Sequence, residues 1–328
     1  MHSLTGVQLL STGSYVPPDV VTNEDLRQLG YDSDWIIQRT GIQSRRRASA
    51  DMATSDLAYE AAQRCLDASG TDVADIDLIL LATMTPDAPI PSTACLLQER
   101  LAAPQAGAMD LNAACAGFMY ALLTGAQFIG AGTCQRVLVV GADINTRIVN
   151  PDDEKTFPLF GDGAGAVLLG PGDDDQGFLA FTMGSDGSGA DLLRIPGGGS
   201  RRPLTPRSLS EGEQFIQMDG RPVFKWAVRT LTDTLQEVLA HANCTLEDIK
   251  QVVLHQANIR IIEAAAEALA IPREKMLINV DRFGNTSAGS IPLGLDESYG
   301  AGNLSRGDRV LLCGFGAGLA WGAAVVQW

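Results

Sequence analysis

The chain has 328 residues, of which 24 are basic and 39 acidic, so its formal net charge at pH 7 is −15. Hydrophobic residues make up 45% of the chain and charged residues 19%, which is typical of a globular enzyme and excludes collagen-like, coiled-coil and disordered proteins. The negative charge would repel nucleic acid phosphates and anionic membranes, so neither is expected as a partner.

No targeting or membrane-spanning segment is expected. Residues 1–18 lack the basic and apolar regions of a signal peptide, and no run of about twenty apolar residues occurs. Six cysteines are scattered along the chain without the close pairs of a zinc site, at positions 65, 95, 115, 134, 244 and 313. This pattern favours a reducing cytoplasmic location. No motif supports a metal, a nicotinamide or a flavin, so no permanently bound cofactor is expected.

Alanine-rich helices and apolar strands alternate along the chain. In order, helical patterns occupy residues 56–68, 116–127 and 226–242, and apolar strands occupy residues 75–81, 136–141, 248–254 and 309–314. The first strand resembles the third and the second resembles the fourth. Both pairs have the same separation along the chain, which we call the repeat interval: from position 75 to 248, and equally from 136 to 309. Two matches at one interval predict a duplicated unit, although two short β-rich segments can also resemble each other by coincidence.

The predicted duplication divides the chain into two halves, residues 1–172 and residues 173–328. The glycine-rich and acidic segment 170–177 lies at their junction. Segment 184–213 is rich in Gly, Ser, Pro and Arg, and we expect it to form a long surface excursion. Strands that are apolar without interruption need cover on both faces, so the sequence predicts an α/β fold with sheets between helices and one shared core.

Cys115 is a candidate nucleophile. It follows a short strand and directly precedes the helical pattern that begins at Ala116. The free N–H groups and the dipole of a helix N-terminus would favour the thiolate and depress the pKa of the thiol. The alternative is a small buried core residue, which is the commonest role of a free cysteine.

Two further segments place polar residues where chemistry is expected. His255 follows the strand that ends at Leu254, at the carboxyl edge where α/β sheets usually carry their active sites. Asn285 lies in the segment 284–290, which also contains position 288, one repeat interval after Cys115. The duplication therefore predicts that the loops of Cys115 and Asn285 face one centre. Taken alone, the two residues would more simply be a capped core histidine and an asparagine in a tight turn.

Blocks of sequence distributed over nearly the whole chain carry a family resemblance; they lie at residues 34–42, 114–118, 160–166, 255–258, 284–290 and 315–322. Together they resemble β-ketoacyl-acyl carrier protein synthase III, of the thiolase superfamily. The resemblance implies a thiolase-like five-layer αβαβα sandwich built from two similar halves. It also implies a decarboxylating Claisen condensation of a short acyl-coenzyme A with malonyl-acyl carrier protein, which initiates fatty acid biosynthesis.

The resemblance implies roles for residues at the reacting centre. Cys115 would attack the acyl thioester and carry the acyl group, and His255 and Asn285 would hydrogen-bond the enolate oxygen as carbon dioxide leaves. Neutral donors suit that task, because a developing enolate needs preorganised hydrogen bonds rather than a strong base. The backbone N–H groups of Cys115 and Ala317 would form the other oxyanion hole.

The resemblance also implies residues that bind the two substrates. Coenzyme A would contact Trp35, Arg39 and Asn258, although Glu154 stands where a second basic residue sometimes occurs. The acyl carrier protein is acidic, so its docking on this acidic chain needs local basic residues. By resemblance, the docking residues are Lys225, Gln256 and Arg260.

Ile90 stands where the family often has a bulky aromatic side chain that caps the acyl pocket of the partner in a homodimer. Because isoleucine is smaller than phenylalanine, primers slightly larger than acetyl are expected to fit. Three other functions stay open at this point. They are a specialised starter enzyme or acyltransferase of polyketide or quinolone biosynthesis, a degradative thiolase with Cys313 as its second cysteine, and a non-catalytic subunit.

Overall fold

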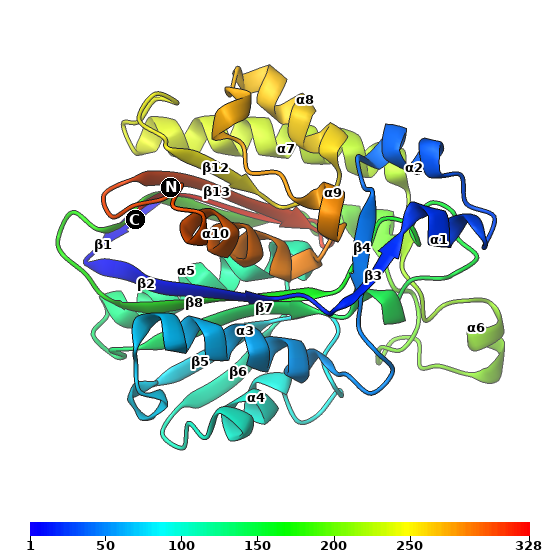
Figure 1. Cartoon of the computed structure of the whole chain (residues 1–328), viewed down its shortest axis with the longest axis horizontal. Helices are drawn as coiled ribbons and strands as arrows, with labels where there is room; N and C mark the ends of the chain where they lie inside the picture. The colour runs from blue at the N-terminus through cyan, green and yellow to red at the C-terminus, as the bar shows by residue number, and fades with distance from the viewer.

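Two five-stranded mixed sheets form the frame of the molecule, whose computed structural model describes residues 1–328 (Figure 1). The first sheet has the order β2-β8-β7-β5-β6, with β2 at Val7–Tyr15, β8 at Gly163–Pro171, β7 at Val137–Asp143, β5 at Leu78–Ala82 and β6 at Gly107–Leu111. The second has the order β1-β9-β14-β13-β12, with β1 at His2–Thr5, β9 at Gly177–Ser185, β14 at Ala320–Gln327, β13 at Arg309–Gly316 and β12 at Gln251–Leu254. Each sheet contains an equivalent parallel pair, β5 with β7 and β12 with β13.

Helices cover both sheets and fill the space between them, so the molecule has five layers (Figure 1). The helices are α3 (Thr54–Ser69) and α4 (Thr93–Leu101) outside the first sheet, α5 (Gly117–Gly130) and α10 (Ser290–Gly300) between the sheets, and α7 (Gly220–His241) and α8 (Ile259–Leu269) outside the second. All residues of β5 and β7 are buried, because helices pack on both of their faces. The predicted α/β sandwich is confirmed.

The internal repeat appears in the structure at the predicted interval. A 3₁₀ turn at Ala114–Ala116 precedes α5, and a second at Ser287–Gly289 precedes α10. Each turn begins with a residue in the left-handed region, Ala114 at φ 47° and Ser287 at φ 51°. This conformation is uncommon for residues other than glycine, so its recurrence at equivalent positions argues against a chance resemblance.

The chain passes from one sheet to the other at the acidic segment. β8 ends at Pro171 and β9 begins at Gly177, but β1 pairs with β9 and therefore adds residues 2–5 to the second sheet. After β9 the chain forms a largely exposed excursion, as predicted, in which β10 (Leu193–Arg194) pairs with β11 (Gln217–Met218). The short helix α6 (Pro206–Ser210) stands away from the body of the molecule (Figure 1).

Short elements complete the chain. They are β3 (Asp19–Thr22), which pairs with β4 (Ser44–Arg47), the helices α1 (Asn23–Arg27), α2 (Ser33–Thr40) and α9 (Val280–Phe283), and 3₁₀ turns at Val73–Asp75, Asn145–Arg147, Gly187–Leu192 and Arg273–Lys275. Among them α2 contacts α8 near the carboxyl end of β12. No helix combines the length and the apolar character needed to cross a membrane.

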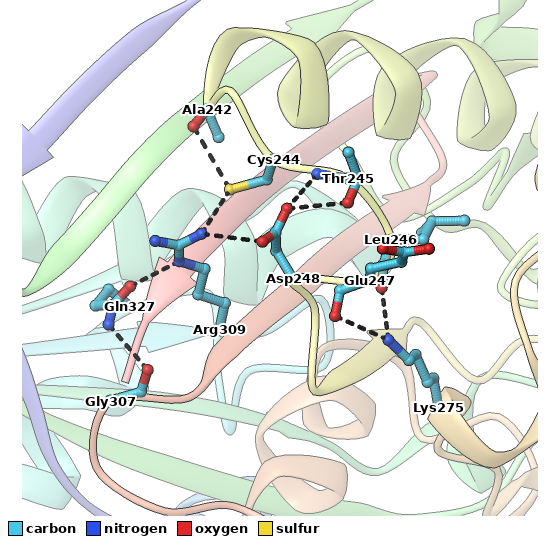
Figure 2. Close-up of polar contacts among 10 residues, drawn as sticks. All are labelled: Ala242, Cys244, Thr245, Leu246, Glu247, Asp248, Lys275, Gly307, Arg309 and Gln327. Carbon is cyan, nitrogen blue, oxygen red and sulfur yellow. Dashed lines mark hydrogen bonds and ion pairs between the residues drawn. The ribbon is translucent and has the colours of Figure 1, made fainter.

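A polar network joins the amino ends of β12 and β13 (Figure 2). Arg309 donates from Nε to Gln327 at 2.9 Å, and its Nη1 lies 3.8 Å from the Asp248 carboxylate. Asp248 accepts hydrogen bonds from the backbone N–H and the hydroxyl of Thr245, and these bonds hold the pKa of the carboxyl below its ordinary value. The network lies at the opposite end of these strands from His255, so it anchors the sheet and leaves the carboxyl edge free for chemistry.

Candidate active site

A cavity of about 740 Å³ begins between α2, α7 and α8 and extends to Cys115. Cys115, His255 and Asn285 all line it. Cys115 lies in the turn before α5, His255 follows β12, and Asn285 precedes the turn that leads into α10. The structure thus brings together at one cavity the three side chains that the sequence singled out, from both halves of the chain.

Cys115 sits at the start of a helix, as the sequence predicts, and is packed closely from the other half. It is buried in the 3₁₀ turn that runs into α5. A side chain on Gly316, at the end of β13, would place its Cβ 2.8 Å from the Cys115 nitrogen and 2.9 Å from its Cβ. Only glycine fits at such a distance, so β13 reaches Cys115 through its backbone.

The ionisation expected for Cys115 is wrong. Burial raises the pKa of the thiol to about 12, and the nearby Asp143 carboxylate adds to this effect. The Ser287 hydroxyl and the Asn285 amide act in the opposite direction but are outweighed. Burial disfavours the charged form more strongly than the helix N-terminus favours it, so the resting protein carries a neutral thiol at pH 7.

His255 is fully buried and neutral. Its Nδ1 lies 2.7 Å from the hydroxyl oxygen of Ser290, at the start of α10. Its ring packs edge to face on Phe315, with 5.1 Å between the ring centroids. Burial lowers the pKa of the imidazole to about 3, with no charged group contributing to the shift. A neutral imidazole lining a cavity can offer its remaining nitrogen to a substrate.

Asn285 is held by hydrogen bonds on its side chain and its backbone. Its Oδ1 accepts from the backbone N–H of Ser287 at 2.8 Å, so the oxygen is engaged and the NH₂ group is left for the cavity. Its backbone N–H donates to Leu159 at 2.8 Å, and its carbonyl accepts from Gly161 at 3.0 Å. The loop at 284–290 is therefore fixed to the segment before β8.

A second cavity, of about 570 Å³, extends from Cys115 in another direction. Its lining is mostly apolar and includes Tyr120, Leu193, Ile216 and Ala317. Ala317 lies in the turn between β13 and β14 and lines this cavity together with Cys115. Ile90 does not line this cavity; its side chain is 85% exposed in the single chain.

The mouth of the larger cavity is basic in an otherwise acidic protein. Five basic residues line it, namely Arg39, Lys155, Arg221, Lys225 and Arg260, against two acidic residues, Glu154 and Asp219. The guanidinium of Arg39 lies over the indole of Trp35, 4.7 Å from the ring centroid. Asn258 caps α8 through its Oδ1 and donates from Nδ2 to the Arg39 carbonyl at 3.1 Å. The mouth of the larger cavity is therefore suited to an anionic, partly aromatic ligand.

Gln256 does not fit the docking role expected from the sequence. Its side chain is completely buried. Its Nε2 donates to the carbonyls of Leu254 and Leu277, and its Oε1 accepts from the backbone N–H groups of Asn279 and Val280. All its hydrogen-bonding positions are used inside the fold, so Gln256 orders the loop after β12 and cannot contact a carrier protein.

Sequence reasoning assigned no role to three buried polar residues around the site, Asp143, Ser287 and Ser290. Asp143 ends β7, and its carboxylate accepts from Met84 N–H at 2.8 Å and Ala288 N–H at 3.1 Å. The Ser287 hydroxyl has no hydrogen-bond partner at ordinary distance, yet it lies near enough to Cys115 to lower the thiol pKa. Both serines lie in the block 284–290, and this block is the only feature of the sequence that indicates a role for them.

No cluster of three or more His, Cys, Asp or Glu side chains is arranged to hold a metal ion.

Comparisons with known proteins agree with this geometry. Family profiles described as 3-oxoacyl-[acyl-carrier-protein (ACP)] synthase III and its C-terminal part match residues 109–187 and 239–328. The chain is 54% identical to β-ketoacyl-[acyl-carrier-protein] synthase III of Rhodopirellula baltica, over the full length of both. The crystal structure of the synthase III from Thermus thermophilus matches with a TM-score of 0.91 and 44% identity over 98% of each chain. A priming β-ketosynthase of the R1128 polyketide pathway matches with a TM-score of 0.91 but only 33% identity, over 99% of this chain and 97% of its own. The chain therefore belongs to the β-ketoacyl-[acyl-carrier-protein] synthase III family of thiolase-like condensing enzymes.

Proposed function

We propose that this enzyme condenses a short acyl-coenzyme A with malonyl-acyl carrier protein through an acyl group carried on Cys115. The products are 3-oxoacyl-acyl carrier protein, carbon dioxide and coenzyme A, and the reaction initiates fatty acid biosynthesis. The observation that supports the residue roles is that a nucleophilic thiol and two neutral hydrogen-bond donors line one cavity. Each half of the chain supplies part of this set.

In the first half-reaction the Cys115 sulfur attacks the carbonyl carbon of the acyl thioester. The backbone N–H groups of Cys115 and Ala317 stabilise the resulting oxyanion, as donors of this kind do in other acyl transfers. The tetrahedral intermediate then expels the coenzyme A sulfur. Because the thiol of Cys115 is neutral at rest, its proton is transferred to coenzyme A, and the half-reaction takes up and releases no net proton.

In the second half-reaction the malonyl group enters the same cavity on the pantetheine arm of the acyl carrier protein. Loss of carbon dioxide leaves an enolate, and His255 and Asn285 donate hydrogen bonds to its oxygen. The enolate carbon attacks the acyl carbonyl, forms the new carbon–carbon bond and expels the Cys115 thiolate, which takes up one proton. Removal of one oxyanion donor typically costs about 3–4 kcal/mol of barrier, so either donor alone is insufficient for a normal rate.

The mouth of the cavity supports the proposal that both substrates enter from one side. Coenzyme A carries phosphates and adenine, which suit Arg39 and Trp35. The carrier protein is acidic, and the exposed Lys225 and Arg260 provide opposite charge at the rim. Asn258 lines the passage between the rim and His255, where the pantetheine arm would lie.

We also propose that the enzyme is a cytoplasmic homodimer that accepts primers slightly larger than acetyl. β6 is an edge strand without a neighbour on one side, and Met109 on it is 42% exposed. The exposed Ile90 would then reach the partner's acyl cavity and set its depth. All six cysteines are free, which is consistent with a reducing compartment.

Mass spectrometry after mixing with acyl-coenzyme A tests the nucleophile and the primer together. The wild-type protein should gain the mass of one acyl group, whereas Cys115→Ala should gain none. Cys95→Ala is the matched control, because Cys95 is exposed and lies outside both cavities; it should acylate like the wild type. Acylation of the Cys115→Ala protein, or failure of every primer with four or five carbons while acetyl succeeds, would overturn the corresponding part of the proposal.

A further inference from the structure

The contact between His255 and Ser290 determines which ring nitrogen carries the proton. A neutral imidazole has one N–H donor and one acceptor nitrogen. Nδ1 of His255 lies 2.7 Å from Oγ of Ser290, and either atom could be the donor. Both residues are 1% exposed, so solvent does not satisfy either group. The direction of this bond follows from the other neighbours of the serine.

Ser290 has two polar neighbours within hydrogen-bond distance. One is Nδ1 of His255, and the other is the backbone N–H of Gln256 at 3.5 Å, which can only donate. Nδ1 is therefore the only acceptor available to the hydroxyl proton. If Nδ1 carried a proton instead, the buried hydroxyl of Ser290 would have no acceptor. Because an unsatisfied buried donor costs free energy, the tautomer with an unprotonated Nδ1 is favoured by roughly tenfold or more.

We propose that Ser290 is a positioning residue that holds His255 in the tautomer with the proton on Nε2. Nδ1 then accepts from Ser290, and the nitrogen left for the cavity is a donor. Phe315 packs against the ring and limits its rotation. The assignment rests on the proposed function in one respect only, namely that the substrate oxygen meets this N–H.

The tautomer has a consequence for the first half-reaction. A nitrogen that already bears a proton cannot accept the proton of the Cys115 thiol. His255 therefore does not act as the base that activates Cys115, and its role is confined to the enolate. Ser290 thus separates the two half-reactions chemically, although both take place in one cavity.

Nuclear magnetic resonance of ¹⁵N-histidine-labelled wild-type enzyme tests the tautomer directly. The chain has only three histidines, at positions 2, 241 and 255, so a His255→Gln variant identifies the signal of interest. Between pH 6 and 8 we expect Nε2 to be protonated and Nδ1 to have the shift of an unprotonated, hydrogen-bonded nitrogen. A proton on Nδ1 would overturn the proposal. This measurement needs no catalysis, so it stands even if the proposed function fails.

Substitution of Ser290 tests the consequence for catalysis. Ser290→Ala should lower kcat for decarboxylation of malonyl-acyl carrier protein about tenfold, the worth of one lost hydrogen bond, with KM and Cys115 acylation within twofold of wild type. Ser290→Thr keeps the hydroxyl and should restore most of the rate. Ser298→Ala removes another buried hydroxyl from α10, bonded to Gln251 away from both cavities, and should leave kcat unchanged. An unchanged kcat and tautomer in Ser290→Ala would overturn the proposal. Normal decarboxylation by His255→Gln would instead remove the proposed role of His255 and leave the tautomer assignment intact.

Discussion

Because His255 is buried in its neutral form, the free energy of unfolding should fall as the pH is lowered. The substitution His255→Gln should remove this part of the pH dependence. The folded-state pKa of His255 is lowered to about 3, whereas an unfolded chain has an ordinary histidine pKa near 6.5. Below pH 6.5 the unfolded chain therefore binds a proton that the folded chain does not. The contribution of this difference to the free energy of unfolding is fully present above pH 6.5 and is lost progressively as the pH falls toward 3.

The size of the effect at pH 5 depends only on the unfolded-state pKa, because the folded-state value lies well below 5. Protonation of the unfolded chain then costs the wild type about 2 kcal/mol relative to pH 7.5. Urea denaturation of the wild type and of His255→Gln, at one protein concentration and at both pH values, measures the difference. The wild type should lose about 2 kcal/mol more than the variant between pH 7.5 and pH 5. Equal losses in the two proteins would show that His255 is accessible to protons, and the argument for a permanently neutral donor would fail.

Three further variants separate the parts of the site. Ser287→Ala removes a hydroxyl that lowers the pKa of the Cys115 thiol, so the pH midpoint for iodoacetamide alkylation of Cys115 should rise. The variant keeps the backbone N–H that orients Asn285, so malonyl decarboxylation should change less than twofold. An unchanged midpoint would exclude a role for the hydroxyl. Lys225→Glu combined with Arg260→Glu should raise KM for malonyl-acyl carrier protein about tenfold and spare acyl-coenzyme A, and an unchanged carrier KM would reject the basic rim. Gly316→Ala should abolish acylation in a folded protein, because its Cβ would lie 2.8 Å from the Cys115 nitrogen; normal acylation would show that the turn can shift.

The relation between the two halves could be predicted because a repeat is a property of the sequence itself. The spacing between residues 75–81 and 248–254 requires no knowledge of packing, and it is sufficient to predict that the Asn285 loop faces Cys115. The place of His255 could also be predicted from the sequence, because a polar residue directly after a buried strand lies at the carboxyl edge of a sheet.

Properties that depend on burial could not be predicted. A helix N-terminus next to Cys115 is visible in the sequence, but the depth of the thiol and the nearby Asp143 carboxylate are not, and these determine its ionisation. Gln256 shows the same limitation. The family resemblance implies a docking contact for Gln256, but four backbone groups satisfy its side-chain amide in the interior. The tautomer of His255 depends on Ser290, which is distant in the sequence and is recognisable as its partner only in three dimensions.

The duplication gives the two halves equivalent turns with different chemistry. Cys115 corresponds to Ala288, and Ala114 corresponds to Ser287, each one repeat interval apart. One turn therefore carries the proposed nucleophile, while the other carries no thiol and provides a hydroxyl and the N–H that orients Asn285. In the proposed mechanism, acyl transfer needs a nucleophile at the acyl carbonyl, whereas decarboxylation needs hydrogen-bond donors at the malonyl thioester oxygen. The turn of the first half supplies the thiol, and the second half supplies the two donors.

This division requires that the two halves keep their relative position. A Cβ on Gly141 would lie 2.2 Å from the carbonyl oxygen of Ala288, and one on Gly314 would lie 3.0 Å from Met119. These two glycines are themselves separated by the repeat interval, so β7 and β13 each pass the turn or helix of the other half at close range. A side chain at Gly141 would overlap the backbone of the other half and push the halves apart, whereas one at Gly314 would crowd the Met119 side chain. The shared core between the sheets is therefore what holds the catalytic geometry, because neither half contains the whole site.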